Sequence, residues 1–298
     1  MNPADNATRT ALLTNADPFI LFHNGIYYGY GTNHDHGFLV YESTDLKSWK
    51  LSDNGRDGFA LKQEDIWGEK WYWAPEIYHI NGKFLIYFTS DYHISCAEAP
   101  TPVGPFVQQE KKPLSPHERR IDNHLFIDDD GKGYCFFSRG IDTMGDGSAI
   151  WAVEVEDDYM STREDTLFRC VGRTEPWESV QNIIVEGPFV IKHNGKYYLT
   201  YSANDYKSHD YAVGYAVADN IKGPYVKAGN NPILHRPANM VGSGHHSFFT
   251  DKDGKLRIVF HVHHNEKEIH PRHTVIGEVF FDGDEMKIGD EFIVPHIQ

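Results

Sequence analysis

The chain of 298 residues has little cysteine and almost no helical periodicity. Its three cysteines, Cys96, Cys135 and Cys170, are odd in number and lack metal-site spacing, so neither a disulfide framework nor a zinc motif is expected. Cys135 falls within a predicted strand and is expected to be a reduced core residue. The near absence of a 3.6-residue apolar pattern argues against a helical fold.

Basic residues are also scarce, with 28 Lys and Arg against 43 Asp and Glu, a formal net charge of −15. Nucleic acids and anionic membranes require basic patches, so neither partner is expected and a neutral small ligand fits better. No apolar run approaches membrane-spanning length, and the first ten residues, MNPADNATRT, lack the apolar segment of a secretory signal. We therefore expect a cytoplasmic protein, although a secreted chain without its leader would look the same.

Five Asn-Gly or Asp-Gly pairs stand between apolar or aromatic runs, and this arrangement is the strongest short signal for a β-hairpin. The pairs recur 49 to 64 residues apart, at Asn24-Gly25, Asn81-Gly82, Asp130-Gly131, Asn194-Gly195 and Asp253-Gly254. The flanking runs are apolar at consecutive positions, as in residues 19–22 and 197–201, which is typical of strands buried on both faces. Five such hairpins predict an all-β fold, a five-bladed β-propeller that occupies residues 1–298 as a single domain.

The start of each hairpin's first strand carries a second pattern. Seven or eight residues before the five turns stand Asp17, Ala74, Asp122, Glu186 and His245. The innermost strand of a propeller blade faces the central channel, so these residues are expected to meet near the axis. Three carboxylates held close would destabilise a plain core, because like charges repel. The cluster is therefore expected to serve catalysis or to hold a cation.

The chemistry that suits such a cluster is hydrolysis of a glycosidic bond. One carboxylate activates water while a protonated carboxyl group protonates the leaving oxygen. Glu186 is the better acid candidate, because glutamate has the higher reference pKa and the apolar Val185, Pro188 and Phe189 adjoin it. Trp73 offers a flat apolar face for a sugar ring.

The ordered motifs resemble those of glycoside hydrolase family 43, the five-bladed propeller arabinofuranosidases, xylosidases and arabinanases. The motifs are Ala16-Asp17-Pro18, Trp73-Ala74-Pro75-Glu76, Ile121-Asp122, Glu186-Gly187-Pro188 and the segment GSGHHS at residues 242–247. The resemblance implies that Asp17 is the general base, Glu186 the general acid, and Asp122 the residue that orients Glu186 and raises its pKa. The family often has Ile-Asp-Pro where this chain has Ile121-Asp122-Asn123, which suggests a different sugar contact.

The resemblance also implies substrate and metal contacts. Arg272 stands where the family has a substrate-binding arginine, and Trp73 and His246 are further expected sugar contacts. His245 resembles the channel histidine that helps to hold a structural calcium ion in many members. By its own chemistry a lone imidazole is a poor calcium ligand, so a hydrogen-bonded core histidine is the alternative. No organic cofactor is expected.

The sequence thus predicts an inverting exo-glycosidase, with α-L-arabinofuranosidase action on hemicellulose-derived oligosaccharides as the leading hypothesis. The long segment from Ser52 to Tyr72 is expected to wall one side of the channel mouth and so to favour a pocket. The alternatives are a β-D-xylosidase, alone or as a second activity, and a non-catalytic sugar-binding propeller. The retaining sucrose and fructan hydrolases are disfavoured, because their Asn-Asp-Pro-Asn and Arg-Asp-Pro patterns are missing.

Overall fold

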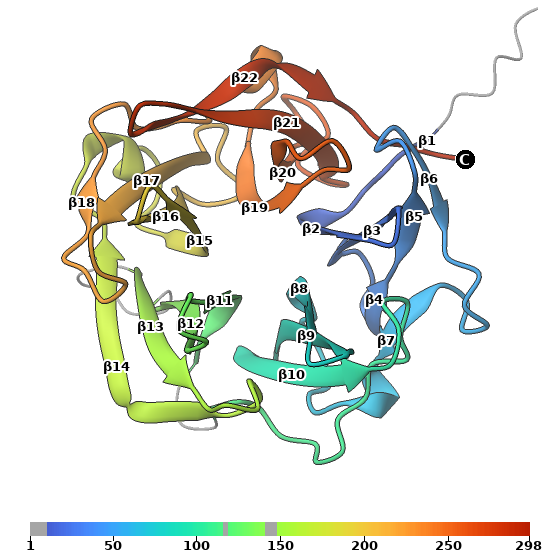
Figure 1. The fold of residues 1–298 in the computed structure, drawn as a ribbon. Helices are drawn as coiled ribbons and strands as arrows, with labels where there is room; N and C mark the ends of the chain where they lie inside the picture. Colours follow the sequence, from blue (N-terminus) through green and yellow to red (C-terminus); the bar gives the residue numbers. More distant parts are fainter. Residues whose placement is uncertain (1–10, 116–118, 141–147) are drawn as a thin grey trace, which may run out of the picture.

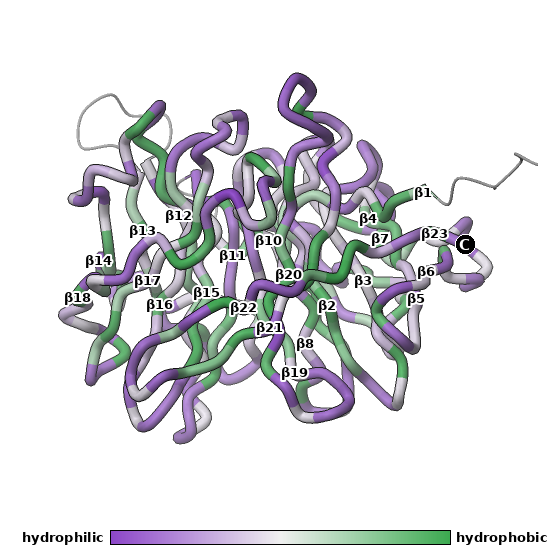
Figure 2. Tube along the Cα trace, turned by 90° about the horizontal axis from the view of Figure 1, so that it is seen from above, coloured by the Kyte–Doolittle hydropathy of each residue, from purple (hydrophilic) through white to green (hydrophobic). Residues whose placement is uncertain are grey.

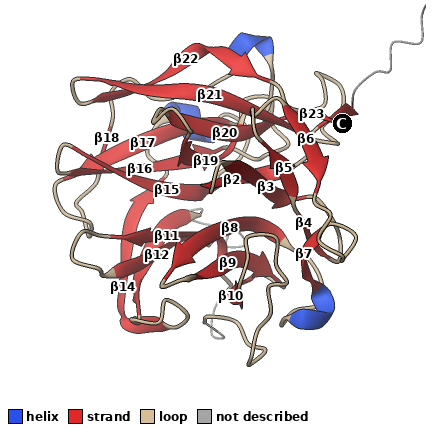
Figure 3. Cartoon of the chain, turned by 45° about the vertical axis from the view of Figure 1, so that its right-hand side comes forward, coloured by secondary structure: helices blue, strands red, loops and turns tan. Residues whose placement is uncertain are grey.

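The computed structural model describes residues 11–115, 119–140 and 148–298. Its sheets stand around a central channel, with the first strand of each blade innermost (Figure 1). Within these ranges nearly all regular structure is β-strand, and the helices are three single 3₁₀ turns; Figure 3 shows the predominance of strands. The prediction of an all-β, five-bladed propeller is confirmed.

Blade by blade, the strands follow the order of the sequence. Blade one holds β2 (Ala16–His23), β3 (Ile26–Thr32), β5 (Tyr41–Ser43) and β6 (Ser48–Leu51). Blade two holds β8 (Trp73–Ile80), β9 (Lys83–Ser90) and β10 (His93–Ala99). Blade three holds β11 (Ile121–Ile127), β12 (Gly133–Arg139), β13 (Ala149–Val155) and β14 (Thr162–Gly172). Blade four holds β15 (Val185–His193), β16 (Lys196–Ala203), β17 (Ala212–Ala218) and β18 (Val226–Lys227). Blade five holds β19 (Gly244–Thr250), β20 (Leu256–Val262), β21 (His273–Asp282) and β22 (Glu285–Ile293).

The remaining elements lie between or outside the blades. They are the two-stranded sheet of β4 (Gly37–Leu39) and β7 (Phe59–Lys62), the terminal strands β1 (Ala11–Leu12) and β23 (His296–Ile297), and the 3₁₀ turns η1 (Gln63–Asp65), η2 (Pro176–Ser179) and η3 (Pro237–Asn239). Within the described residues, no helix is both long and apolar enough to cross a membrane.

The two ends of the described chain close the ring. Strand β23 pairs antiparallel with β1 and parallel with β6, so both terminal strands extend the sheet of blade one. The Leu13 N–H donates to the Pro295 carbonyl at 3.0 Å, and the Thr274 N–H of blade five donates to the Leu13 carbonyl at 3.0 Å. In Figure 1 the C-terminus accordingly lies beside β1 and β6. Backbone hydrogen bonds thus join the last blade to the first.

The predicted turns take two forms. At the three Asn-Gly pairs both central residues have positive φ, for example 50° at Asn24 and 82° at Gly25, as a two-residue type I′ hairpin requires. At the two Asp-Gly pairs the strands are joined by five residues, 128–132 and 251–255, in which only the glycine has positive φ. All five hairpins are present, but blades three and five carry longer connections than a type I′ turn.

Five buried apolar clusters lie between neighbouring blades. The strands of a blade contribute alternate residues to the clusters on its two sides: in β16, Tyr197, Leu199 and Tyr201 pack toward blade three, whereas Tyr198 packs toward blade five. The same alternation puts Ile86 and Leu85 of β9 on opposite sides. This explains the apolar runs without alternation, which appear in Figure 2 as hydrophobic tube along the strands and hydrophilic tube at the loops.

The three cysteines are free thiols, as expected. Cys96 and Cys135 lie buried together in the cluster between blades two and three, and Cys170 is half-buried.

Candidate active site

Each innermost strand breaks register with its hairpin partner at one place near its start. The irregularity falls between a paired residue near the start of the strand and the residue three positions later, from Ala16/Phe19 in blade one to Gly244/Ser247 in blade five. In blade four it follows Glu186, the second residue of the strand to pair. At each irregularity one residue adopts positive φ; these residues are Asp17 (47°), Ala74 (48°), Asp122 (57°), Gly187 (56°) and His245 (45°). A β-bulge of this kind re-aims side chains toward the channel.

The bulges correct the alignment of blade four. The residue equivalent to Asp17, Asp122 and His245 is Gly187, not Glu186. Glu186 occupies the preceding position, the one held by Trp73 in blade two and Ile121 in blade three. Counting back from the turns misaligned it by one residue, because blades three and five have longer connections than the other blades. Side chains from two successive strand positions therefore line the cavity: Trp73, Ile121 and Glu186 from the first position, and Asp17, Asp122 and His245 from the second.

A ring of hydrogen bonds between neighbouring blades holds the bulges in place. In four of the five blades the backbone N–H of the bulge residue donates to a side chain on the second strand of the preceding blade. The bonds are Ala74 to Thr32 Oγ1 at 3.1 Å, Asp122 to Thr89 Oγ1 at 3.1 Å, His245 to Ser202 Oγ at 2.9 Å, and Asp17 to His261 Nδ1 at 3.2 Å. In blade four the Gly187 N–H instead donates to Asp122 Oδ2 at 3.3 Å. The backbone of each bulge is thus positioned by its neighbour, and in blade four that partner is the candidate catalytic carboxyl group itself.

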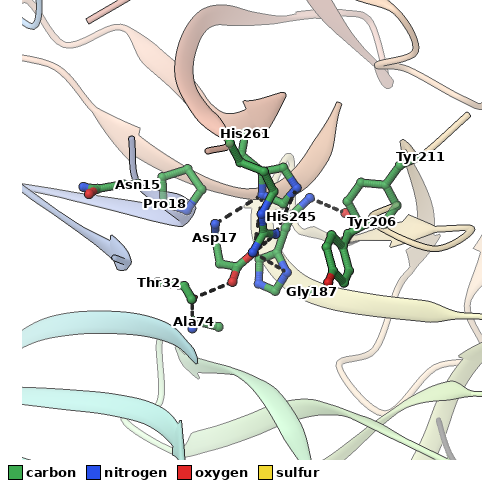
Figure 4. A network of polar contacts seen from close by, with 12 residues as sticks. Asn15, Asp17, Pro18, Thr32, Ala74, Gly187, Tyr206, Tyr211, His245 and His261 are labelled. Carbon is green, nitrogen blue, oxygen red and sulfur yellow. Dashed lines mark hydrogen bonds and ion pairs between the residues drawn. The ribbon is translucent and has the colours of Figure 1, made fainter. Parts of the chain in front are cut away.

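Asp17 lies beside Thr32, His245 and His261 (Figure 4). Its Oδ1 accepts a hydrogen bond from Arg272 Nη1 at 2.9 Å and lies 3.4 Å from His245 Nδ1, while its Oδ2 accepts one from Thr32 Oγ1 at 2.5 Å. Burial acts to raise the pKa of Asp17, but Arg272, with His245 and His261, outweighs it and holds the pKa well below its usual range. Asp17 is therefore a carboxylate at neutral pH.

The environment of Glu186 raises the pKa of its carboxyl group instead of lowering it. Burial raises its pKa, the hydrogen bond from Tyr211 Oη at 2.8 Å lowers it, and the charges of Asp17 and Asp205 raise it again, to about 8. The pKa of Asp122 is also raised well above its usual range, by burial and by the charges of Glu186 and Asp17. Glu186 therefore holds a proton at neutral pH, as a general acid must.

Tyr211 reaches Glu186 through a space that a side chain would otherwise fill. Gly244 occupies the position in blade five that Glu186 and Trp73 hold in their blades. A Cβ at Gly244 would lie only 2.3 Å from the Tyr211 ring, so a larger residue there would collide with the tyrosine. The glycine thus admits the ring of Tyr211, which comes from the first residue before β17. The two residues together fix one oxygen of the acid.

These side chains surround a cavity of about 250 Å³. It is lined by Asp17, Trp73, Tyr92, Ile121, Asp122, Ile184, Glu186, Asp205, Tyr206, His245 and Arg272. Its volume lies below the ~300–1,000 Å³ of pockets that hold drug-sized ligands, and it suits a single sugar ring. The structure thus brings together six of the seven residues singled out in the sequence: the three carboxyl groups, Trp73, Arg272 and His245.

His246 lies elsewhere. It is 3% exposed, its Nε2 lies 2.6 Å from Thr200 Oγ1, and its ring packs edge-on against Phe248. His246, the residue directly after the bulge, is not among the residues that line the cavity. The structure does not support the predicted sugar contact of His246, because this side chain contacts Thr200 of β16, the second strand of blade four, and Phe248 of its own strand β19.

Comparison with known proteins identifies the family. The sequence model of glycosyl hydrolases family 43 matches residues 11–286. The chain belongs to this family. Among solved structures, an endo-1,4-beta-xylanase from Bacteroides thetaiotaomicron is 39% identical with a TM-score of 0.90, and the match covers 97% of this chain and 99% of that one.

Curated relatives of this family 43 protein are more distant. An arabinoxylan arabinofuranohydrolase from Paenibacillus polymyxa is 28% identical over 75% of this chain and 38% of its own length. A beta-xylosidase from Xylanibacter ruminicola is 27% identical over 66% of this chain and 67% of its own length. Across the first three curated relatives that it matches, the chain spans 38% to 48% of their lengths.

The family resemblance implies that His245 helps to hold a calcium ion. Among the described residues, one group of three side chains has the spacing for a metal: Asp122, Glu186 and His245, whose ligand atoms all lie within 4.8 Å of one another. Calcium takes six to eight oxygen ligands, whereas this group offers one nitrogen and two carboxyl groups. The donor set does not match calcium, and the chemistry proposed below uses no metal.

Several residues of the site were not predicted from the sequence. A signal for one set existed: Thr32, Thr89, Ser138, Ser202 and His261 each stand seven residues after a turn glycine. This count is the same in all five blades, although one residue separates the glycine from the second strand in blades three and five. Four of these residues accept the inter-blade hydrogen bonds. Tyr211, Asp205 and Tyr206 lie in or next to the connection between β16 and β17, where no repeat phase applies.

Proposed function

We propose that the protein is an inverting exo-glycoside hydrolase that releases terminal α-L-arabinofuranose from hemicellulose-derived oligosaccharides. The observation that carries the proposal is a cavity for one sugar ring in which two buried carboxyl groups have opposite protonation states. A sugar-binding propeller has no need of this arrangement, whereas acid–base hydrolysis depends on it.

In the proposed reaction Asp17 accepts a proton from a water molecule as that water attacks the anomeric carbon. Glu186 gives its proton to the glycosidic oxygen as the bond to the leaving group breaks. Arg272 and Thr32 hold both oxygens of Asp17, so the base is oriented before substrate arrives. Attack from the face opposite the leaving group inverts the anomeric carbon.

Asp122 acts on the acid rather than on the sugar bond in this proposal. Its Oδ2 accepts the Gly187 N–H, which fixes the peptide that follows Glu186. Its ligand oxygen lies within 4.8 Å of that of Glu186, so ionisation of either group disfavours ionisation of the other. Asp122 thereby helps to keep the acid protonated.

The choice of arabinofuranose draws on the relatives, since the arabinoxylan arabinofuranohydrolase aligns with three quarters of this chain. β-D-Xylosidase activity, alone or as a second activity, is the alternative, because the similar beta-xylosidase aligns along two thirds of both chains. The small volume of the cavity, which suits one sugar ring, favours exo action over the internal cleavage named for the Bacteroides thetaiotaomicron structure.

The test is a panel of nitrophenyl α-L-arabinofuranoside, β-D-xyloside and β-D-galactoside, with the released anomer followed by NMR. The proposal expects the highest kcat/KM on the arabinofuranoside and an inverted product. Preference for the xyloside would select the alternative, and a retained anomer would exclude the mechanism. No hydrolysis of any of the three would favour a sugar-binding propeller.

A further inference from the structure

The connection between β16 and β17, residues 204–211, supplies three side chains to the active site. Asp205 and Tyr206 line the cavity, and Tyr211 donates to Glu186; Figure 4 shows both tyrosines at the site. Because this connection lies outside the sheet of blade four, contacts from neighbouring segments must hold its backbone in place.

One such contact comes from blade five through His263, the residue that follows β20. His263 is 4% exposed, and its Nε2 lies 2.7 Å from the carbonyl oxygen of Tyr206. A carbonyl oxygen only accepts hydrogen bonds, so Nε2 carries the proton and donates. Among the described residues, the buried Nδ1 of the same ring has no hydrogen-bond partner. The bond to Tyr206 is therefore the polar contact that orients this ring.

The segment before β19 is shaped around the His263 ring. Gly242 has a φ of 65°, and a Cβ there would lie 2.1 Å from the ring, so a side chain at this position would displace the histidine. The Gly242 N–H donates to the His209 carbonyl of the β16–β17 connection at 3.3 Å. The His263 N–H donates to the Val241 carbonyl at 3.0 Å. Both the ring and its surroundings thus join blade five to this connection.

Tyr206 in turn supports the cation beside the base. The Arg272 guanidinium lies over the Tyr206 ring, 4.6 Å from its centroid, and donates to Asp17 Oδ1 at 2.9 Å. The face of an aromatic ring attracts a cation, so the ring helps to hold the guanidinium in place. Burial raises the pKa of Asp17, and Arg272 lowers it more than His245 or His261 does. A contact that orients Tyr206 therefore acts on the ionisation of the base.

The bond from His263 does not depend on the charge of the ring. Burial lowers the pKa of His263, whereas the bond to the Tyr206 carbonyl raises it. Nε2 carries a proton in both the neutral and the charged ring, so the bond forms in either state. The other titratable groups near His263 are His209, His270 and Arg272, and those that face Asp17 from blades three and four are Asp122 and Glu186.

We propose that His263 is a positioning residue of this hydrolase, which fixes the Tyr206 ring beneath Arg272 and thereby holds the cation against the base Asp17. His263 is not among the residues that line the cavity, so it acts through Tyr206. The inference rests on the proposed function, because it assigns a further residue to the same reaction.

The test compares His263→Leu, which removes the donor, with His263→Gln, whose side-chain amide is able to donate to the same carbonyl oxygen. We expect kcat/KM on a nitrophenyl pentoside to fall about tenfold in His263→Leu, as for one lost hydrogen bond, and to recover largely in His263→Gln. The pKa of Asp17 should rise when Arg272 is less firmly held, so the acid limb of the pH–rate profile should move to higher pH.

A double-mutant cycle separates positioning from a general loss of stability. With Tyr206→Leu already in place, His263→Leu should add no further shift of the acid limb, because the ring through which it acts is gone. His193→Leu is the matched control: His193 ends β15 and stacks on Phe281 with ring centroids 3.7 Å apart. Its loss should lower Tm and leave the acid limb in place.

An acid limb that stays in place in His263→Leu would overturn the inference, and so would an equal further shift in the Tyr206→Leu background. If His263→Leu does not fold, Gly242→Ala displaces the ring from the other side and should move the limb in the same direction. Carboxyl-carbon NMR titration of the free protein, with the Asp17 signal assigned through Asp17→Asn, follows the same pKa without substrate. Failure of the wild-type protein to cleave any aryl pentoside would reject the proposed function, and this titration would still decide whether His263 acts on Asp17.

Discussion

The two sides of the active-site cavity bury carboxyl groups to a similar degree yet give them opposite protonation states. On the side of blades one and five, Asp17 is 7% exposed and has Arg272 and two histidines beside it. On the side of blades three and four, Glu186 is 9% exposed and has Asp122 and Asp205 nearby. Burial alone would raise both pKa values. The difference shows that the neighbouring charges, rather than burial, determine which carboxyl group is ionised and which holds a proton.

The largest expected effect comes from removing either carboxyl group. Asp17→Asn and Glu186→Gln should each lower kcat/KM on an oligosaccharide by about 10³-fold, within the range of general acid–base catalysis. On a nitrophenyl glycoside Glu186→Gln should lose much less, because a good leaving group needs little protonation, whereas Asp17→Asn should lose as much as before. Steady-state kinetics on both substrates measure this, and a reversed pattern would exchange the assigned roles.

Arg272→Gln should have the next largest effect, because it removes the main cation beside Asp17. A charge-assisted hydrogen bond of about 1.5–3 kcal/mol corresponds to roughly a 10- to 100-fold loss in kcat/KM. The pKa of Asp17 should rise, so the acid limb of the pH–rate profile should move to higher pH, since the base must be ionised to act. An acid limb that stays in place would show that burial and the histidines set this pKa without Arg272.

Asp205→Asn should reduce the difference in pKa between Asp17 and Glu186 by acting on Glu186. In the wild-type protein, activity should fall as the pH rises through about 8, because Glu186 then loses its proton. Removing the negative charge of Asp205 should lower the pKa of Glu186 and move this alkaline limb to lower pH, with about a tenfold change in rate or less. Asp219→Asn, an exposed change at the end of β17, is the control and should leave the limb in place.

Among these substitutions Tyr211→Phe should change the rate least, and it should move the alkaline limb in the opposite direction to Asp205→Asn. The Tyr211 hydroxyl stabilises ionised Glu186, so its loss should raise the pKa of Glu186 and move the alkaline limb to higher pH. The rate near pH 6 should change by about two- to tenfold, as for a net hydrogen bond of ~0.5–1.5 kcal/mol. A pH–rate profile of the variant measures both; a shift to lower pH would contradict the assigned hydrogen bond.

Much of this site could be predicted from the sequence because the fold repeats. Turn residues with positive φ mark each hairpin, and residues at a fixed distance from a turn take equivalent places in every blade. The count succeeded for Asp17, Asp122 and His245 and misplaced Glu186 by one position, because the two Asp-Gly connections are longer than the Asn-Gly turns. The residue seven positions after each turn glycine would have been the more regular marker, since this distance is the same in all five blades.

The sequence by itself thus determined the number of blades, the inner strands and which residue types lie on them, since turn chemistry and apolar patterning are local properties. The sequence predicted Glu186 as the acid and, through the family resemblance, Asp17 as the base, but only the tertiary structure decided which of the two carboxyl groups is ionised. That choice depends on Arg272 and His261 from blade five and on Tyr211 and Asp205 from blade four, residues far from Asp17 along the chain. Electrostatic interactions act through space, so charges that the ring closure brings together set pKa values that no local pattern encodes.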